Sequence, residues 1–317
     1  MVPYIDFHAD TITELEVQET LELNRKMVSL GRLEEANCKV QFFSAYVNTG
    51  SYPEETRDQD AWKEYQRILG RYKDALKAHP EKLLGIRTQK DLEECFAGNK
   101  IGTVFTIEDG GVLGGSMKKL EQVHEDGVRL ITLTWNHENA IAYPNSQDPE
   151  VMRKGLKPFG FDVLEAMAEK NMIVDVSHLS DGGFWDVSRH YKGVFVASHS
   201  NSRAMQNHQR NLTDEMIREI ANHGGIIGLN LFGPFLAGDE VSRVSDMVRH
   251  VKHIYRTGGE EVLAIGSDFD GIHGELEIDE PVKLHKLYQA LEQEGFTSSI
   301  LEKMWYQNGL RVLKQIK

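Results

Sequence analysis

The chain has 317 residues, and its 36 basic and 49 acidic side chains give a formal net charge of −13 at neutral pH. An acidic surface argues against nucleic acid or an anionic membrane as a partner of this protein. The sequence contains no run of about 20 apolar residues, so we expect no transmembrane helix. Residues 1–6 lack the basic and apolar regions of a signal peptide, and two cysteines are too few for a disulfide framework, which together favour a cytoplasmic location.

Short apolar, β-branched segments alternate along the chain with longer segments of helical periodicity. Eight of the short segments are predicted strands, at residues 3–8, 40–46, 102–107, 128–134, 172–177, 194–198, 225–230 and 262–266. The clearest helical segments are residues 161–168, 213–220, 247–255 and 298–316, and Thr213 is the expected N-cap of the second. Strands that alternate with helices pair in parallel, and eight such units predict a closed (β/α)8 barrel.

The predicted fold class is therefore α/β, a single TIM-like barrel with extra loops and a C-terminal helical tail. A doubly wound open sheet is the alternative, but a glycine-rich turn normally follows the first strand of such a sheet. No glycine-rich turn follows residues 3–8, and no linker or repeat divides the chain. We therefore interpret residues 1–317 as one domain.

Residues able to bind a metal ion follow five of the predicted strands. They are His8 and Asp10 at the first strand, Glu108 at the third, His178 at the fifth, His199 at the sixth, and Asp268 and Asp270 at the eighth. The C-terminal ends of barrel strands converge on one face, and active sites are built there. Imidazole and carboxylate groups gathered on that face are typical ligands of zinc and of neighbouring divalent ions.

Each of these residues alone also has a structural interpretation. A single histidine such as His8 is more often a buried, hydrogen-bonded side chain than a metal ligand, and Asp268 or Asp270 could belong to the turn before Gly271. The regular placement of the whole set at strand ends favours a metal site. Such a site lowers the pKa of bound water from about 15.7 to about 7, which is the chemistry that a hydrolase needs at neutral pH.

Seven short motifs occur in a fixed order along the chain. They are DFHADT at residues 6–11, QFFSAY at 41–46, GLKPFG at 155–160, VDVSHLS at 174–180, SHS at 198–200, RN at 210–211 and GSDFDG at 266–271. As an ordered set, they resemble the membrane (renal) dipeptidase family of amidohydrolase-type, metal-dependent barrels. The resemblance extends over residues 5–312, which is nearly the whole chain.

The resemblance implies a binuclear site with two Zn²⁺ per subunit. The implied ligands are His8 and Asp10 for the first zinc, Glu108 as the bridge, and His178 and His199 for the second zinc. Asp268 would orient the metal-bridging hydroxide that attacks the peptide bond and would shuttle its proton. Arg210 would bind the free C-terminal carboxylate of a dipeptide, for which a guanidinium group offers bidentate geometry. The implied substrates are short dipeptides, L,D-dipeptides included, and the implied assembly is a homodimer.

Two positions depart from the family pattern. Trp135 stands where the family usually has a substrate-binding histidine, and His137 lies two residues further on. We predict that His137 takes this catalytic role at the substrate carbonyl oxygen. The alternative is that His137 faces solvent or packs on a loop, and that Asn136 or water acts instead. Gly111 stands where the family often has a histidine, three residues after the bridging Glu108, so we expect a contact that supports the metal site to be missing.

Other titratable residues are expected to be outside the catalytic set. His250 and His253 have the i, i+3 spacing of one helix face, and we expect that face to be solvated. His208 is a weaker candidate for the substrate pocket. Cys38 and Cys95 lack the histidine pattern of a nucleophilic cysteine.

Two other functions remain open. One is a different amidohydrolase-type reaction, such as lactone, N-acyl or phosphotriester hydrolysis, but those relatives more often begin with His-x-His and bridge the metals with a carboxylated lysine. Asp10 and Glu108 therefore favour the dipeptidase. The other is a catalytically impaired barrel that acts as a binding protein, although a binding protein would not need all five predicted ligands.

Overall fold

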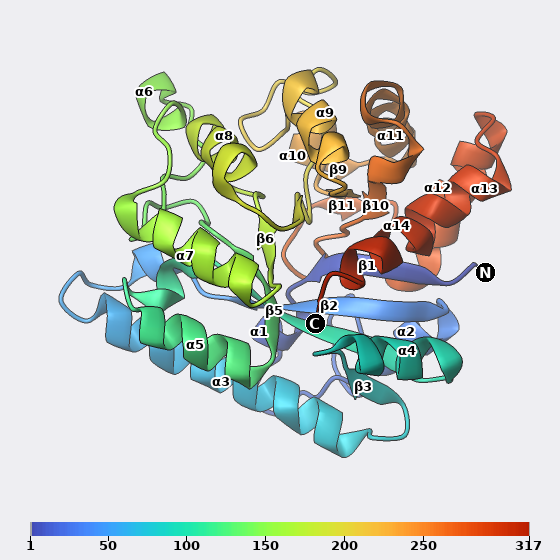
Figure 1. Ribbon diagram of the computed structural model, residues 1–317. Coiled ribbons are helices and arrows are strands. Elements are labelled where there is room, and N and C mark those ends of the chain that lie inside the picture. Colours follow the sequence, from blue (N-terminus) through green and yellow to red (C-terminus); the bar gives the residue numbers. More distant parts are fainter. Residues whose placement is uncertain (1, 317) are drawn as a thin grey trace.

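The computed structural model describes residues 2–316, which fold around a ring of parallel strands (Figure 1). The ring contains, in chain order, β1 (Tyr4–Ala9), β2 (Cys38–Tyr46), β4 (Ile101–Glu108), β5 (Val128–Thr132), β6 (Ile173–Asp175), β7 (Phe195–Val196), β8 (Ile227–Leu229) and β10 (Leu263–Ile265). A parallel bridge between Ala197 and Ile227 brings the two ends of the ring together. The nearly closed ring confirms the predicted eight-stranded barrel and rules out the open doubly wound sheet.

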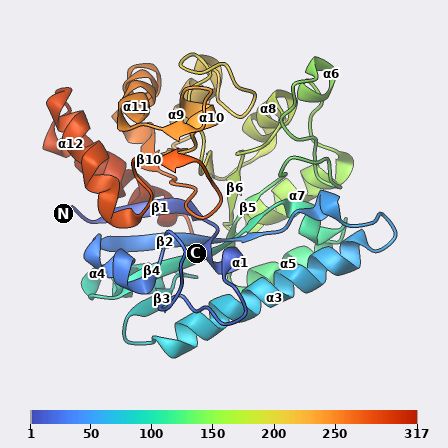
Figure 2. The same ribbon diagram turned by 180° about the vertical axis from the view of Figure 1, so that it is seen from behind.

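Helices surround the strands, as the two opposite views in Figures 1 and 2 show. They are α1 (Thr11–Glu14), α2 (Leu30–Glu35), α3 (Arg57–Ala78), α4 (Gln89–Ala97), α5 (Met117–Asp126), α6 (Pro149–Met152), α7 (Pro158–Glu169), α8 (Asp181–His190), α9 (Asp214–Asn222), α10 (Gly233–Leu236), α11 (Val244–Gly258), α12 (His285–Gln293), α13 (Ser298–Glu302) and α14 (Asn308–Leu313). Within residues 2–316, no helix is both long enough and apolar enough to cross a membrane.

Several short elements were not predicted from the sequence. They are the strands β3 (Leu83–Gly85), β9 (Val241–Ser242) and β11 (Glu275–Leu276) and the 3₁₀ turns η1 (Thr49–Ser51), η2 (Gly110–Leu113), η3 (Glu260–Val262) and η4 (Pro281–Leu284). The strand β3 pairs with β4, whereas β9 and β11 pair with each other. Segments of two to four residues contain too little periodicity to be recognised in a sequence.

The predicted helices are present, and one of them is divided. Thr213 caps α9 as expected, because its side chain accepts a hydrogen bond from the Met216 backbone N–H at 3.3 Å. The tail predicted at residues 298–316 consists of α13, a π-helical segment η5 (Lys303–Gln307) and α14. Met304 and Trp305 in η5 are buried, so the tail is part of the packed structure.

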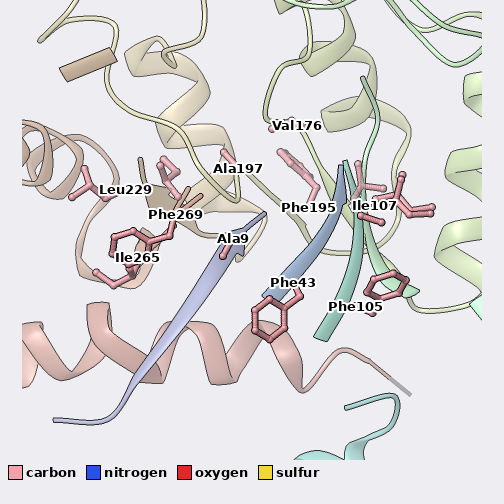
Figure 3. Packing of buried hydrophobic residues seen from close by; sticks show 14 of the residues in the cluster. Ala9, Phe43, Phe105, Ile107, Val176, Phe195, Ala197, Leu229, Ile265 and Phe269 are labelled. Atoms are coloured by element: carbon pink, nitrogen blue, oxygen red, sulfur yellow. The ribbon is translucent and has the colours of Figure 1, made fainter. Parts of the chain in front are cut away.

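The core consists of apolar side chains between the strands and the surrounding helices. Figure 3 shows buried side chains from several strands of the ring, among them Phe43, Phe105 and Phe195. The Phe105 ring stacks on Tyr72 of α3 with 4.5 Å between ring centroids, which fixes α3 against β4. Burying a side chain of this size stabilises the fold by about 1.5–3 kcal/mol.

Two glycines allow the last strands of the ring to approach one another. Gly228 lies in β8 and Gly266 follows β10, and a Cβ atom at either position would overlap the backbone carbonyl oxygen of Ser198. The absence of side chains at both positions therefore lets three strand ends meet. This close approach places the residues after Ser198 beside those after Gly266 at the mouth of the barrel.

We expect Gly228→Ala to destabilise the fold by about 1–3 kcal/mol, because the added methyl group forces β7 and β8 apart. The matched control is Gly70→Ala in the middle of α3, where a Cβ atom meets nothing within 4 Å. That change should stabilise the protein by about 0.5–1 kcal/mol, because alanine favours a helix over glycine. Urea unfolding followed by circular dichroism measures both, and equal unfolding midpoints would contradict the proposed cause of closure.

Candidate metal centre

Six polar side chains converge at the carboxyl ends of the barrel strands. They are His8 in β1 and Asp10 after it, Glu108 at the end of β4, His178 after β6, His199 after β7, and Asp268 after β10. All six are at least nine-tenths buried. The structure therefore brings together the five residues predicted as metal ligands and the aspartate predicted to carry the proton, because the carboxyl ends of parallel barrel strands meet on one face.

Glu108 occupies the middle of this cluster. Its Oε2 atom lies 3.3 Å from His8 Nε2, while its Oε1 atom lies 3.0 Å from His178 Nε2 and 3.5 Å from His199 Nε2. Asp10 Oδ2 lies 3.5 Å from the same His8 Nε2 atom. The two oxygens of one carboxylate thus face two different sets of nitrogen and oxygen donors.

The partners of two histidines determine which ring nitrogens are free to bind a metal. His178 Nδ1 lies 3.0 Å from the Asn136 side-chain oxygen, to which it can only donate. The Ser198 hydroxyl donates to Asp175 at 2.6 Å, so it accepts from His199 Nδ1 at 2.7 Å. Each imidazole therefore directs the lone pair of its Nε2 atom toward Glu108.

This arrangement fits a bound divalent cation. The Nε2 atoms of His178 and His199 lie 3.1 Å apart, and burial lowers the pKa of both rings, that of His178 to about 3. Two neutral nitrogen acceptors and a carboxylate oxygen thus face one another with no proton between them. His8 Nε2 and Asp10 Oδ1 are also buried without a hydrogen-bond partner. Buried acceptors of this kind are costly unless a cation or a donor satisfies them, and imidazole with carboxylate is a typical donor set for zinc.

The charges in the cluster are strongly coupled. Burial, reinforced by the charge of Glu108, raises the pKa of Asp10 to about 7 against the attraction of His8. Burial alone would also raise the pKa of Glu108, but the charge of His8 holds it well below its usual value. Burial opposes protonation of His8, yet Glu108 and Asp10 raise the pKa of its ring well above the usual value. A divalent cation would compensate the same carboxylates without a protonated histidine.

Two further buried aspartates hold the turns that carry the ligands. Asp175 accepts hydrogen bonds from the Thr132 hydroxyl at 2.6 Å and from the Ser198 backbone N–H at 2.9 Å. Asp6 accepts from the backbone N–H and the hydroxyl of Ser267, at 2.9 and 2.6 Å. Both aspartates lie within the sequence motifs DFHADT and VDVSHLS, but no role was predicted for them. Their position two or three residues before a histidine ligand is the signal that could have revealed them.

The backbone is left-handed at several points of this site. His178 has φ of 67° and Asp268 has φ of 63°, and Asp109 and Asp270 also have positive φ. Non-glycine residues rarely adopt this conformation, and where they do the surrounding structure has to hold them in it. The hydrogen bonds to Asp6 and Asp175 at the neighbouring strand ends provide that support.

The structure separates the roles of the two aspartates left open by the sequence. Asp268 Oδ1 lies 3.8 Å from His8 Nε2, and its Oδ2 accepts a hydrogen bond from the Asn230 side chain at 2.8 Å. The Asp270 carboxylate instead accepts from the Thr11 hydroxyl at 2.5 Å and from the Met27 backbone N–H at 2.6 Å. Asp268 therefore faces the ligand cluster, whereas Asp270 holds the loop before α2.

Arg210 lies in the segment between β7 and α9 and is only 5% exposed. Its Nη2 atom donates to the His199 carbonyl oxygen at 3.2 Å, its guanidinium carbon lies 5.2 Å from the centre of the Phe235 ring, and its Nε atom has no partner. Burial lowers the pKa of Arg210 to about 10, so the group stays charged at neutral pH. A buried cation with an unsatisfied donor can bind a carboxylate. His208 accepts a hydrogen bond from the Arg210 backbone N–H at 3.1 Å and supports this segment.

A cavity of about 490 Å³ opens over the cluster. Its lining residues are Asp10, Glu14, Tyr46, Glu108, Trp135, Asn136, His178, Phe232, Phe235, Asp268, Asp270, Gly271, Ile272 and His273. The structure does not bring His137 to this wall, because His137 is exposed and its ring packs closely on Gly50 and lies 5.8 Å from that of Trp135. Trp135 and Asn136 occupy the wall instead.

The second departure from the family pattern also has a structural reason. A Cβ atom at Gly111 would meet the Thr49 hydroxyl, so no histidine fits there without a shift of the neighbouring loop. The Asp109 carboxylate fills the adjacent space, where it accepts hydrogen bonds from the Thr49 hydroxyl at 2.6 Å and from the Gly111 backbone N–H at 2.9 Å. The loop after Glu108 is thus ordered by Asp109 and not by a histidine.

The expectation of a solvated helix face at His250 and His253 was wrong for His250. His250 is fully buried, accepts a hydrogen bond from the Ser202 backbone N–H at 3.1 Å and donates to the Leu236 carbonyl oxygen at 2.9 Å. His253 lies 2.7 Å from Asp214. The i, i+3 spacing places both rings on the face of α11 that packs on neighbouring segments, where they join parts of the fold.

A nearly closed parallel barrel with this cluster at its carboxyl ends defines a metal-dependent hydrolase. The family model for the membrane dipeptidase (peptidase family M19) matches residues 1–317, and the chain belongs to this family. It is therefore a metallo-dipeptidase, which confirms the assignment made from the sequence motifs.

Individual relatives agree with the family assignment. An uncharacterized protein in the pqqA 5′ region of Klebsiella pneumoniae is 33% identical over 236 residues, covering 71% of this chain and 86% of that protein. The dipeptidase tcpJ of Claviceps purpurea is 29% identical over 329 aligned positions, covering 99% of this chain and 74% of the relative.

Solved structures share the fold. The metallopeptidase dipeptidase AC superposes with a TM-score of 0.88 at 23% identity, covering 99% of this chain and 98% of the other. A metallopeptidase from Rhodobacter sphaeroides, solved with a phosphinate mimic of the dipeptide L-Ala-D-Ala, has a TM-score of 0.87 at 22% identity, covering 100% of this chain and 99% of the other.

We expect Asn136→Ala to weaken Zn²⁺ binding about 10–100-fold, because His178 loses the acceptor that fixes its ring nitrogens. The control is His137→Ala, one residue further on, which removes a side chain outside the cavity and should leave the affinity unchanged. Competition with a chromophoric chelator measures both dissociation constants. Unchanged affinity in the Asn136 variant, or an equal loss in both, would contradict this role.

Proposed function

We propose that the protein is a zinc dipeptidase with two Zn²⁺ per subunit that hydrolyses dipeptides with a free C-terminal carboxylate, L,D-dipeptides included. The observation that carries the proposal is the position of Glu108, whose two oxygens face separate donor sets 3.0–3.5 Å away. A homodimeric assembly and a cytoplasmic location remain predictions from the sequence.

The ligands divide between the two oxygens of Glu108. His8, Asp10 and Oε2 would hold one ion, and His178, His199 and Oε1 would hold the other. Zinc in such a site lowers the pKa of water toward neutrality and polarises a carbonyl group.

Asp268 is the residue best placed to move a proton. Its Oδ2 atom is engaged by Asn230, whereas its Oδ1 atom points toward the cluster and lines the cavity. We infer that Oδ1 accepts a proton from the attacking water and returns it to the leaving amine, as a general base and then a general acid. His137 has no part in this proposal, because its ring lies outside the cavity wall; its predicted role stays a prediction.

The substrate would be held by its charged end. Arg210 is buried, retains an unpartnered Nε atom and stacks on Phe235, which lines the cavity, so we assign it to the C-terminal carboxylate. Phe232 and Phe235 form an apolar wall that would exclude water around the scissile bond. The dipeptide mimic bound by the Rhodobacter sphaeroides relative supports the inclusion of L,D-dipeptides among the substrates.

The direct test is hydrolysis of L-Ala-D-Ala and L-Ala-L-Ala by zinc-loaded protein, with a chelated sample as the control. We expect metal-dependent release of free amino acids from both compounds. A strong preference for the L,L compound would contradict the L,D part of the proposal. No release from either compound with two zinc ions bound would contradict the whole proposal and direct attention to lactone and N-acyl substrates.

We expect Asp268→Asn to retain two zinc ions per subunit but to lose about 10²–10⁴-fold in kcat, because the amide cannot accept the proton. The isosteric change preserves the hydrogen bond between Asn230 and this side chain through the amide oxygen. Zinc content by atomic emission and steady-state kinetics measure the two effects separately. Full turnover in the variant would refute the assigned role, and loss of zinc would make Asp268 a ligand instead.

A further inference from the structure

One charged side chain of the cavity is not used in the mechanism above. Glu14 is the last residue of α1, and its carboxylate lines the cavity with Asp10 and Glu108. The other three residues of α1 are buried, whereas Glu14 is exposed. The helix therefore presents this one polar side chain to the cavity.

The base of Glu14 is fixed in place. The Thr13 hydroxyl donates to the Ser44 carbonyl oxygen of β2 at 2.9 Å, and the Thr11 hydroxyl donates to Asp270 at 2.5 Å. These bonds connect α1 both to the barrel and to the segment after β10. The backbone at Glu14 is thus held in place, and its carboxylate can move only by rotation of the Glu14 side chain.

The Glu14 carboxylate has no direct partner within the described part of the chain. Among residues 2–316, no hydrogen-bond donor engages its carboxylate and no cation lies within ion-pair distance. Arg67 and Arg71 of α3 act on Glu14 electrostatically, but Arg67 is paired with Glu64 at 2.8 Å and Arg71 donates to the Thr13 carbonyl oxygen at 2.9 Å. The carboxylate remains available to a cation that enters the cavity.

Two aromatic side chains complete this part of the wall. Tyr46 and Trp135 meet edge to face with 5.0 Å between ring centroids, and both line the cavity. The Tyr46 backbone N–H donates to the Thr13 hydroxyl at 3.0 Å, which holds the tyrosine next to Glu14. Aromatic faces beside a carboxylate favour an ammonium group.

The acidic wall lies across the barrel mouth from Arg210. Tyr46 ends β2, on which α1 packs, and Arg210 follows β7. In the ring order, β2 and β7 are separated by four steps in either direction, so they stand on opposite sides. Glu14 thus lines the cavity on one side of the ligand cluster, and the cationic Arg210 lies on the other side against Phe235, which lines the cavity.

We propose that Glu14 determines specificity by binding the free α-ammonium group of a dipeptide, beside Tyr46 and Trp135. This proposal rests on the dipeptidase function proposed above. A zwitterionic dipeptide matches the two sides of the cavity, with its carboxylate at Arg210 and its ammonium at Glu14. An N-acylated dipeptide would bury the Glu14 carboxylate without a partner, so the substrate class is unblocked dipeptides and not N-acyl compounds.

The test compares L-Ala-D-Ala with N-acetyl-L-Ala-D-Ala on zinc-loaded parent, Glu14→Gln and Glu16→Gln proteins. Glu14→Gln should lower kcat/KM for the free dipeptide about 10–100-fold, the size expected for a lost contact to a charged group, mainly through KM. The acetylated compound, followed as substrate and as competitive inhibitor, should bind parent and variant equally. Glu16 is exposed, lies two residues after the end of α1 and does not line the cavity, so its variant should match the parent.

The outcomes separate the role of Glu14 from the dipeptidase function. Zinc content and thermal unfolding first establish that the Glu14 variant is folded and loaded. An unchanged preference for the free dipeptide, or an equal loss on both compounds, would overturn the role of Glu14 while the dipeptidase function stands. Absence of hydrolysis by the parent protein would overturn both proposals together.

Discussion

The burial of the Glu108 carboxylate among three histidines is the interaction on which the barrel mouth depends. A carboxylate removed from water is costly unless charges or hydrogen bonds compensate it. Here the nitrogens around it cannot all donate, because Asn136 and Ser198 direct the Nε2 lone pairs of His178 and His199 toward it. The folded chain therefore holds a group of hydrogen-bond acceptors that a divalent cation would satisfy. Their positions are set by contacts within the protein itself.

The positions of the ligands are maintained by two buried carboxylates, Asp6 and Asp175, which lie next to the ligand cluster but outside it. Asp175 and Asp6 bind backbone N–H groups at the ends of the neighbouring strands, which keeps His178 and Asp268 in left-handed conformations. The close approach of the last strands, which Gly228 permits, brings these turns within reach of one another. Local strain at the ligands is thus balanced by hydrogen bonds and packing that lie outside the cavity.

The sequence predicted the barrel and the ligand cluster because both follow from periodic patterns. Alternation of apolar strands with helices identified all eight strands of the ring, and strand ends identified residues such as Glu108. What could not be predicted depends on contacts between segments far apart in the chain. His250 is buried because α11 packs against the loop that contains Ser202, and His137 lies outside the cavity because its ring packs on Gly50. Neither neighbour can be recognised from local sequence.

Trp135 stands in the cavity wall where the family resemblance predicts a substrate-binding histidine, and this affects how the cavity can recognise a substrate. An aromatic face replaces a ring nitrogen in the wall, so recognition under the proposed function falls to the charged groups on either side, Glu14 and Arg210. Contacts to the two ends of a dipeptide do not distinguish the configuration of the side chains between them. Discrimination between L,L and L,D compounds must then come from the space beside Phe232 and Phe235. Apolar contacts there are non-directional, so they tolerate side chains of either configuration.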